Sequence, residues 1–140
     1  MHNLLHPDIT GKIIKAFYTI YNTLGFGFLE KVYENALAIE LRNTDLRVSQ
    51  QQPVKVYYDG QLVGVYYADL IIENSVIVEL KAAETLYEAQ LLNYLKATEI
   101  EVGMLLNFGM KPEYKRKIFT NNRKRLTTDD TDLTDLKRII

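Results

Sequence analysis

The amino-acid sequence predicts a small α/β domain with a central mixed β-sheet flanked by helices. Two observations carry this prediction. Apolar residues recur at helical spacing through the first forty or so positions, and three short runs rich in β-branched and aromatic residues follow. A further amphipathic segment and a buried apolar run come next, so the expected order is roughly α-α-β-β-β-α-β. The 140 residues are expected to form one domain with a sizeable core.

Two helices are expected in the N-terminal part of the chain. From about Pro7 to Leu24, apolar side chains recur every three or four positions, as on one face of a helix. The run Gly25-Phe26-Gly27 interrupts this pattern and indicates a helix stop followed by a fresh start. A second helix is therefore expected from about Phe28 to Arg42.

Two tight turns connect the three expected strands. The alternating run 54–58 leads into Asp59-Gly60, a strong hairpin signal. The next two strands, 66–72 and 76–82, are separated by Glu73-Asn74-Ser75, which has the length of a three-residue hairpin loop. This loop would pair Ile72 with Val76, and the same register places Asp69 directly opposite Glu79.

The second half of the chain is expected to hold one more helix and one more strand. An amphipathic pattern runs from about Thr85 to Thr98, and a buried apolar run follows from Glu101 to Phe108, closed by Gly109. From about residue 111 onward the chain reads as a charged C-terminal tail.

Asp69, Glu79 and Lys81 form the most informative group of residues. Glu79 and Lys81 lie two apart inside an apolar run, so they share one face of the expected strand. Directly opposed residues have Cβ atoms about 4.5–5.5 Å apart, and two carboxylates that close raise each other's pKa. Such a pair needs a proton, a cation or a metal. The alternative for the Glu-x-Lys pattern alone is the solvated face of an edge strand.

Two helical pairs add polar groups near these strands. Gln90 and Tyr94 are four apart and share a helical face, as Glu30 and Tyr33 do at a spacing of three. Gln90 and Tyr94 could contact a nucleotide or phosphate, or pack at a helix boundary. Glu30 borders the apolar stripe and could point inward, although by itself it reads as a surface glutamate.

Composition and charge exclude several classes of protein. There is no cysteine, which excludes disulfides and thiolate metal sites and favours a cytoplasmic location. No apolar stretch reaches the length of a transmembrane helix, and no signal peptide is apparent. The net charge of −1 does not mark the whole protein as a polyanion binder.

The basic residues are nevertheless concentrated near the C-terminus. Seven of them fall between Lys111 and Arg125, and four aspartates follow between Asp129 and Asp135. The basic segment could contact phosphates, with Lys115, Arg116 and Lys117 as candidates. Alternatively, the basic and acidic blocks offset each other on a solvated tail.

The ordered combination of Asp69, then Glu79-Leu80-Lys81, then Gln90 and Tyr94 resembles the PD-(D/E)xK nuclease superfamily. Within it, the chain is similar to the RecB-like branch, which has a Gln-x-x-x-Tyr helix. More narrowly, residues 27–33 match the signature of the GxxExxY family, and four later stretches resemble that family (68–70, 78–82, 88–96 and 102–109). The likeness covers residues from about Ile9 to Phe119, and Ala68 stands where the superfamily name has proline.

The resemblance implies a restriction-endonuclease-like core and a role for each matched residue. Asp69 and Glu79 would be ligands of Mg²⁺ or Mn²⁺, with the Leu80 carbonyl as a third. Lys81 would orient the attacking water or stabilise developing charge. Glu30 would be the acidic residue that the superfamily places on the helix before the sheet, often facing the metal, and so a further catalytic residue and metal ligand. The accessory substrate-binding residues would be Gln90, Tyr94 and Tyr33.

The sequence thus favours a metal-dependent nuclease that hydrolyses phosphodiester bonds in nucleic acid, with DNA as the expected substrate. Two alternatives stay open. One is a nucleic-acid-binding or protein-interaction module that keeps the fold without cleavage, and the other is a phosphodiesterase acting on a small nucleotide. No membrane partner is expected, and a homodimer is left open.

Overall fold

A computed structural model describes residues 5–82 and 89–124 of the chain. Five strands form a single mixed sheet in the order β1-β2-β3-β4-β5, in which β3 and β4 are parallel and all other neighbours are antiparallel. The strands are β1 (Val48–Tyr58), β2 (Gln61–Ile72), β3 (Val76–Lys81), β4 (Val102–Phe108) and β5 (Pro112–Ile118). The predicted α/β class is confirmed.

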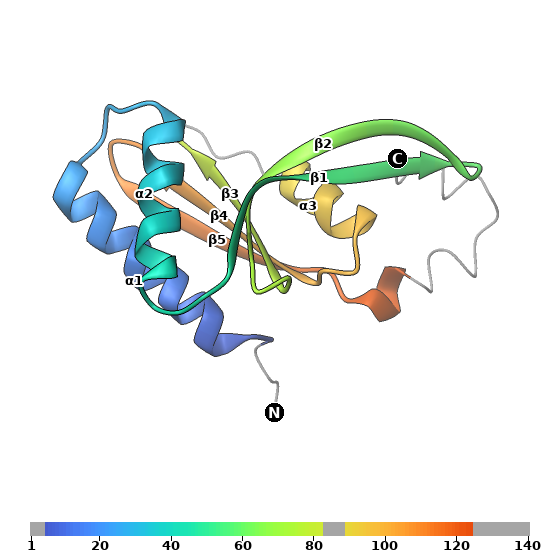
Figure 1. Ribbon diagram of the computed structural model, residues 1–140, viewed down its shortest axis with the longest axis horizontal. Coiled ribbons are helices and arrows are strands. Elements are labelled where there is room, and N and C mark those ends of the chain that lie inside the picture. Colours follow the sequence, from blue (N-terminus) through green and yellow to red (C-terminus); the bar gives the residue numbers. More distant parts are fainter. Residues whose placement is uncertain (1–4, 83–88, 125–140) are drawn as a thin grey trace.

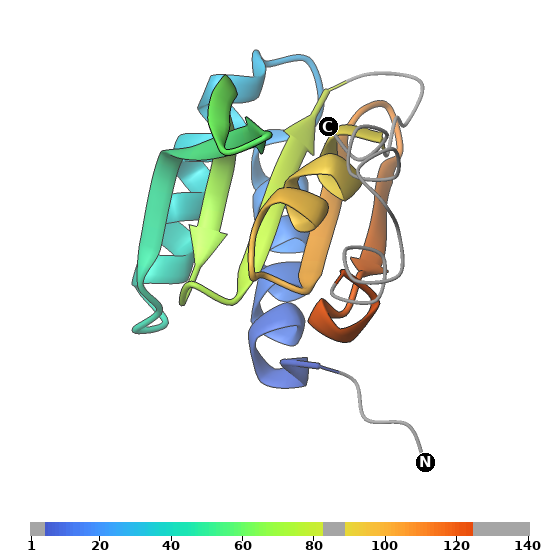
Figure 2. The ribbon, with the colours of Figure 1, turned by 90° about the vertical axis from the view of Figure 1, so that its right-hand side faces the viewer.

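Helices cover both faces of this sheet (Figure 1, Figure 2). On one face lie α1 (Pro7–Leu24) and α2 (Glu30–Arg42), and on the other lies α3 (Ala89–Ala97). Each face has its own apolar core. The helix expected from Thr85 is observed from Ala89 onward, and its expected start lies outside the described residues. No described helix is long and apolar enough to cross a membrane.

The close approach of α3 to the sheet depends on a glycine in β4. A Cβ atom added to Gly103 would lie 2.5 Å from Leu91 Cδ1 on α3, which is closer than real Cβ atoms come to a neighbour. Any larger residue at this position would force Leu91 to move, so glycine permits the observed approach of the helix to the strand.

Both predicted turns are present. Asp59 and Gly60 have φ angles of 53° and 72°, as a type I′ hairpin turn requires, and Tyr58 pairs with Gln61. In the second turn, Glu73 and Asn74 both have φ of 53°. The three-residue loop predicted for 73–75 is confirmed, because Ile72 pairs with Val76.

Strands β1 and β2 extend beyond the rest of the sheet as a two-stranded arm (Figure 1). Pairing between β2 and β3 ends at Leu70↔Val78, whereas β1 and β2 stay paired as far as their hairpin turn. The arm contacts α3, since the Tyr94 hydroxyl donates a hydrogen bond to the Tyr67 carbonyl at 3.3 Å. The base of the arm is thus held against α3, close to Asp69.

The segment expected to begin a charged tail contains strand β5, which extends the predicted element order. Its charges conceal the strand pattern because β5 lies at a sheet edge, where charged side chains are common. Arg116 pairs with Met104, a core residue of the α1–α2 side, whereas Lys115 pairs with Leu105 of the α3 side. Lysine and arginine residues of this segment therefore point to opposite faces.

Candidate active site

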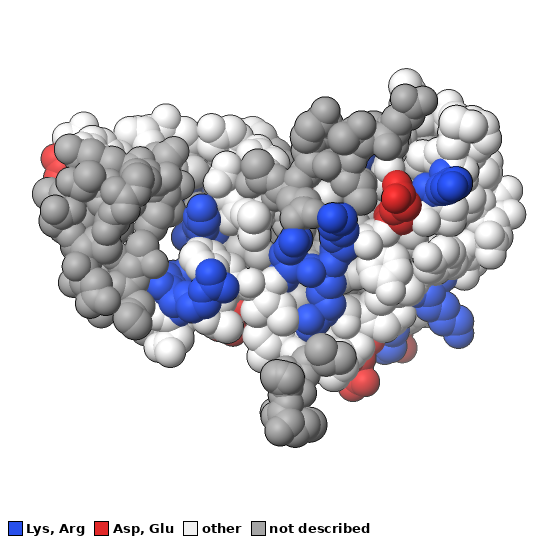
Figure 3. Space-filling model, turned by 180° about the vertical axis from the view of Figure 1, so that it is seen from behind, with Lys and Arg blue, Asp and Glu red and all other residues white. Residues whose placement is uncertain are grey.

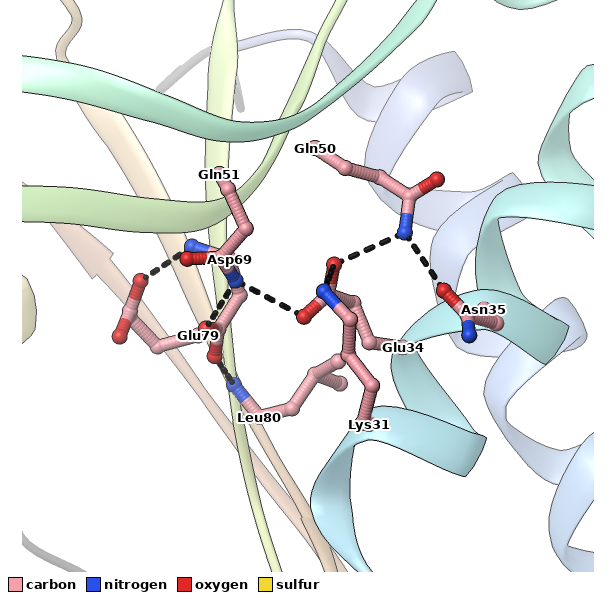
Figure 4. A network of polar contacts seen from close by, with 8 residues as sticks. All are labelled: Lys31, Glu34, Asn35, Gln50, Gln51, Asp69, Glu79 and Leu80. Carbon is pink, nitrogen blue, oxygen red and sulfur yellow. Dashed lines mark hydrogen bonds and ion pairs between the residues drawn. The ribbon is translucent and has the colours of Figure 1, made fainter.

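Asp69 and Glu79 lie just beyond the last residue pair of the β2–β3 ladder, where the register predicted from the hairpin loop places them. Each carboxylate accepts a hydrogen bond from the backbone of the other strand. Glu79 Oε2 accepts from the Asp69 N–H at 2.9 Å, and Asp69 Oδ2 accepts from the Leu80 N–H at 2.8 Å (Figure 4). The two side chains thus replace the ladder hydrogen bonds at this point and fix each other's position.

Both carboxylates are held in an environment that disfavours charge. Glu79 is 6% exposed, and burial, followed by the charge of Asp69, raises its pKa to about 8. Burial is also the main cause that raises the pKa of Asp69, against the lowering effect of the Leu80 N–H bond. An acidic pair of this kind, with Glu79 buried and Asp69 half-buried, is stabilised by a proton or by a cation.

Lys81 lies two residues after Glu79 on β3, so both side chains belong to the same face of the sheet. Its positive charge lowers the pKa of Glu79, against the larger raising effects of burial and of the Asp69 charge. The backbone N–H of Leu80 is engaged by Asp69, as described above, and its side chain is buried. The proposed part of the Leu80 carbonyl as a metal ligand stays a prediction.

The acidic residue of α2 that is linked to Asp69, through Gln51, is Glu34, which sequence reasoning missed. Glu34 is only 3% exposed and accepts hydrogen bonds from the amides of Gln50 at 2.8 Å and Gln51 at 2.9 Å. It also forms an ion pair with Lys31 at 3.1 Å. The Gln51 amide donates to Asp69 Oδ1 as well, at 3.2 Å, so that it bridges Glu34 and Asp69 (Figure 4).

The two α2 residues predicted from the sequence, Glu30 and Tyr33, have other surroundings than Glu34. Glu30 is exposed at the first position of α2, although its charge contributes to the raised pKa values of Asp69 and Glu79. Tyr33 is fully buried, stacks on Phe108 with ring centroids 4.3 Å apart, and donates its hydroxyl proton to the Gly25 carbonyl. The predicted substrate contact of Tyr33 is therefore wrong, because its ring and hydroxyl are used to anchor the α1–α2 loop.

Gln90 and Tyr94 share a helical face, as predicted, and are hydrogen-bonded to each other. The Gln90 amide donates to the Tyr94 hydroxyl at 3.0 Å. Tyr94 is 4% exposed, and its pKa is raised by burial first and then by the charge of Glu79. This pair therefore borders the carboxylates from the α3 side, and its substrate-binding role stays a prediction.

The donor chemistry of Asp69 and Glu79 fits a hard divalent cation. Carboxylate oxygens are preferred ligands of Mg²⁺ and Mn²⁺, and Mg²⁺ is commonly held by one or two carboxylates together with several waters. Within residues 5–82 and 89–124, no group of three or more acidic or histidine side chains could hold a metal ion. The residues present therefore fit a two-carboxylate site, in which backbone oxygen and water would complete the coordination.

The three basic residues predicted to contact phosphates divide between the faces of the sheet. Glu79 pairs with Leu105, which pairs with Lys115, so Lys115 occupies the same cross-strand row as Glu79. Two strand spacings separate them, about 10 Å. Lys117 is on the same face, whereas Arg116 donates a hydrogen bond to the Leu5 carbonyl on the side of α1. The geometry favours Lys115 and Lys117 over Arg116 as phosphate contacts.

We expect alanine substitutions of the two α2 glutamates, Glu34 and Glu30, to differ in their effects on protein stability. Glu34→Ala should destabilise the protein by about 1–3 kcal/mol, because the hydrogen bonds from Gln50 and Gln51 and the ion pair with Lys31 to a buried carboxylate are lost. Glu30→Ala should leave stability nearly unchanged, since its side chain is exposed. Urea unfolding measures the first effect, and Mn²⁺ titration of both variants shows which glutamate supports metal binding. Equal stability of the two variants would contradict the structural role of Glu34.

Comparison with known proteins identifies the superfamily of the chain. Residues 7–117 match the sequence profile of the PD-(D/E)XK nuclease superfamily, and no curated protein matches the sequence. Among solved structures, an alkaline exonuclease (LHK-Exo) from Laribacter hongkongensis is similar, with 8% identity, a TM-score of 0.47, and coverage of 98% of this chain and 80% of that chain. The profile spans most of the chain and includes Asp69, Glu79 and Lys81, and the protein therefore belongs to the PD-(D/E)XK nuclease superfamily.

Proposed function

We propose that this protein is a Mg²⁺- or Mn²⁺-dependent nuclease that hydrolyses phosphodiester bonds in DNA. The observation that carries the proposal is the pair of carboxylates, the half-buried Asp69 and the buried Glu79, each hydrogen-bonded to the backbone of the other's strand, with Lys81 on the sheet face of Glu79. Residues 27–33 and the Gln90–Tyr94 pair support a finer placement in the GxxExxY family and the RecB-like branch.

Each residue of the group has a chemical task that its position allows. Asp69 and Glu79 would hold the cation, which when bound polarises a phosphoryl oxygen and lowers the pKa of its water. Lys81, on the face of Glu79, would place a positive charge against the oxygens on which negative charge develops. The Leu80 and Asp69 backbone amides keep the two carboxylates oriented, so the site is assembled before substrate arrives.

A polymeric substrate is supported by the distribution of charge. Figure 3 shows lysine and arginine side chains gathered on the face of the molecule that carries the β5 edge of the sheet. Lys115 and Lys117 of that strand share the sheet face of Glu79, at a distance that spans more than one nucleotide. Phosphates on either side of the scissile bond would therefore meet positive charge.

The test is a cleavage panel with linear, circular, single-stranded and branched DNA, with RNA, and with a small bis-ester of phosphate. Each substrate is incubated with Mg²⁺, Mn²⁺ or EDTA, and the Asp69→Asn protein is the control for contaminating nuclease. Metal-dependent cleavage of DNA by the wild type alone supports the proposal. Cleavage of the bis-ester alone would identify a small-nucleotide phosphodiesterase, and binding without any cleavage would identify a binding module.

Neutralising Lys115 and Lys117 together to glutamine should weaken DNA binding about tenfold or more near physiological salt. The reason is that each lost phosphate contact also removes counterion release, so the slope of log Kd against log salt should fall by about two. Fluorescence anisotropy across a salt series measures both quantities. Arg116→Gln is the matched control, because Arg116 faces α1, and it should leave the slope unchanged. An equal change of slope in the double lysine variant and in Arg116→Gln would contradict the placement of the lysines and Arg116 on opposite faces of the sheet.

A further inference from the structure

Gln51 has an unusual backbone conformation for a residue inside a β-strand. Its φ angle is 54°, in the left-handed region that residues other than glycine, asparagine and aspartate rarely adopt. The β1–β2 ladder runs regularly up to Gln50↔Leu70 and resumes at Gln52↔Ala68. The irregularity therefore falls on the one position that faces Asp69 across the two strands.

This conformation changes where the neighbouring side chains point. Consecutive residues of a regular strand face opposite sides of the sheet. Here Gln50 and Gln51 both donate to the carboxylate of Glu34, one to each oxygen. The left-handed residue thus turns two successive amides toward the same buried acid.

The side-chain amide of Gln51 bridges one oxygen of Glu34 and one oxygen of Asp69. Its amide nitrogen donates to Glu34 Oε1 and to Asp69 Oδ1, whereas the other Asp69 oxygen accepts the Leu80 N–H. Gln51 therefore fixes the Asp69 oxygen that the backbone leaves available. Strained backbone that is kept at a site of converging charge commonly serves that site.

We propose that Gln51 is a positioning residue that holds the Asp69 carboxylate, through Glu34, in the orientation that receives the divalent cation. The inference rests on the proposed function. In the metal-free protein the amide donors of Gln51 offset the like charges of Glu34 and Asp69. Without Gln51, Asp69 keeps its backbone bond but its second oxygen is no longer oriented, and the cation must order it on binding.

The test uses two substitutions of Gln51 and measures Mn²⁺ binding as well as stability, because a purely structural role would change stability alone. Gln51→Gly removes the amide while accepting a φ of 54° without strain. Its melting temperature without metal should fall less than that of Glu34→Ala, because the relief of backbone strain opposes the loss of two hydrogen bonds. Isothermal titration should give about tenfold weaker Mn²⁺ binding. Gln51→Glu replaces the bridging donors with a third carboxylate. Its melting temperature in EDTA should fall, and its Mn²⁺-induced rise should exceed that of the wild type.

The neighbouring Gln52 supplies the matched control, since it keeps a regular ladder position opposite Ala68. Gln52→Glu adds the same charge one residue away and should alter neither the Mn²⁺ affinity nor the metal-induced shift. Mn²⁺ binding by Gln51→Gly as tight as that of the wild type overturns the inference and leaves the proposed function intact. Absence of Mn²⁺ binding and cleavage in the wild type overturns both.

Discussion

Glu79→Gln should make the metal-free protein more stable while reducing DNA cleavage about a thousandfold or more. The amide has nearly the shape of the carboxylate and still offers an oxygen to the Asp69 N–H, but it carries no charge to be buried beside Asp69. Loss of a metal ligand removes several kcal/mol of transition-state stabilisation, which corresponds to several powers of ten in rate. Opposite effects on stability and activity are expected where a site is built from repelling charges.

The stability gain should depend on pH in a defined direction. The pKa of Glu79 is raised from 4.5 to about 8 in the folded protein. Its contribution to stability is therefore fully present below pH 4.5 and is lost as the pH rises through 8. The wild type in EDTA should lose about 2–4 kcal/mol from this group between pH 5 and pH 9. Glu79→Gln should remove that part of the loss, leaving the smaller contribution of Asp69, whose raised pKa acts in the same direction.

Thermal unfolding in EDTA between pH 5 and pH 9 measures this difference. Glu73→Gln is the control, because Glu73 lies in the turn between the same two strands and its pKa is lowered by hydrogen bonds from Arg47. A group with a lowered pKa loses its contribution only at acidic pH, so this variant should follow the wild type above pH 5. Parallel curves for wild type and Glu79→Gln would show that Glu79 is not a buried acid of raised pKa.

Lys81→Met should reduce cleavage about a hundredfold to a thousandfold while leaving DNA and Mn²⁺ binding nearly unchanged. Methionine keeps most of the apolar length of the side chain but lacks the charge that would face the developing negative oxygens. An interaction made mainly in the transition state lowers kcat and kcat/KM together. Single-turnover cleavage with anisotropy-based DNA binding separates the two effects.

The control for this experiment is Lys15→Met, an exposed lysine on α1, on the other side of the sheet. It should keep the wild-type rate. If Lys81→Met instead weakened DNA affinity in proportion to its loss of rate, Lys81 would be a ground-state phosphate contact. Full activity of Lys81→Met would remove Lys81 from the reaction altogether.

Local patterns in the sequence predicted the fold and the placing of Asp69 and Glu79. The hairpin loop 73–75 set the β2–β3 register, and strand alternation then put Lys81 on the face of Glu79. Strand β5 was harder to predict because an edge strand buries too little to show an apolar pattern. Its charged residues were therefore assigned to a tail.

Glu34 and Gln51 could not have been identified by the same reasoning. Glu30 and Glu34 are both on the second helix, and helical periodicity does not tell which of them faces a distant strand until the helix is packed. The position of Gln51 depends on a left-handed backbone within a strand, which no residue type in that stretch signals, since glycine and asparagine are absent from 48–58. The run of three glutamines was the one visible oddity.

The hydrogen bonds that close the β2–β3 ladder affect how far conserved acidic residues in related chains can be taken as a sign of catalytic activity. Asp69 and Glu79 accept the backbone N–H groups that would otherwise be left without partners where the strands part. A descendant that no longer cut nucleic acid would still gain folding stability from oxygen acceptors at these two positions. Selection for folding alone would then slow their replacement. An intact acidic pair is therefore weaker proof of retained catalysis than an intact pair together with Lys81, whose side chain closes no ladder hydrogen bond among the described residues.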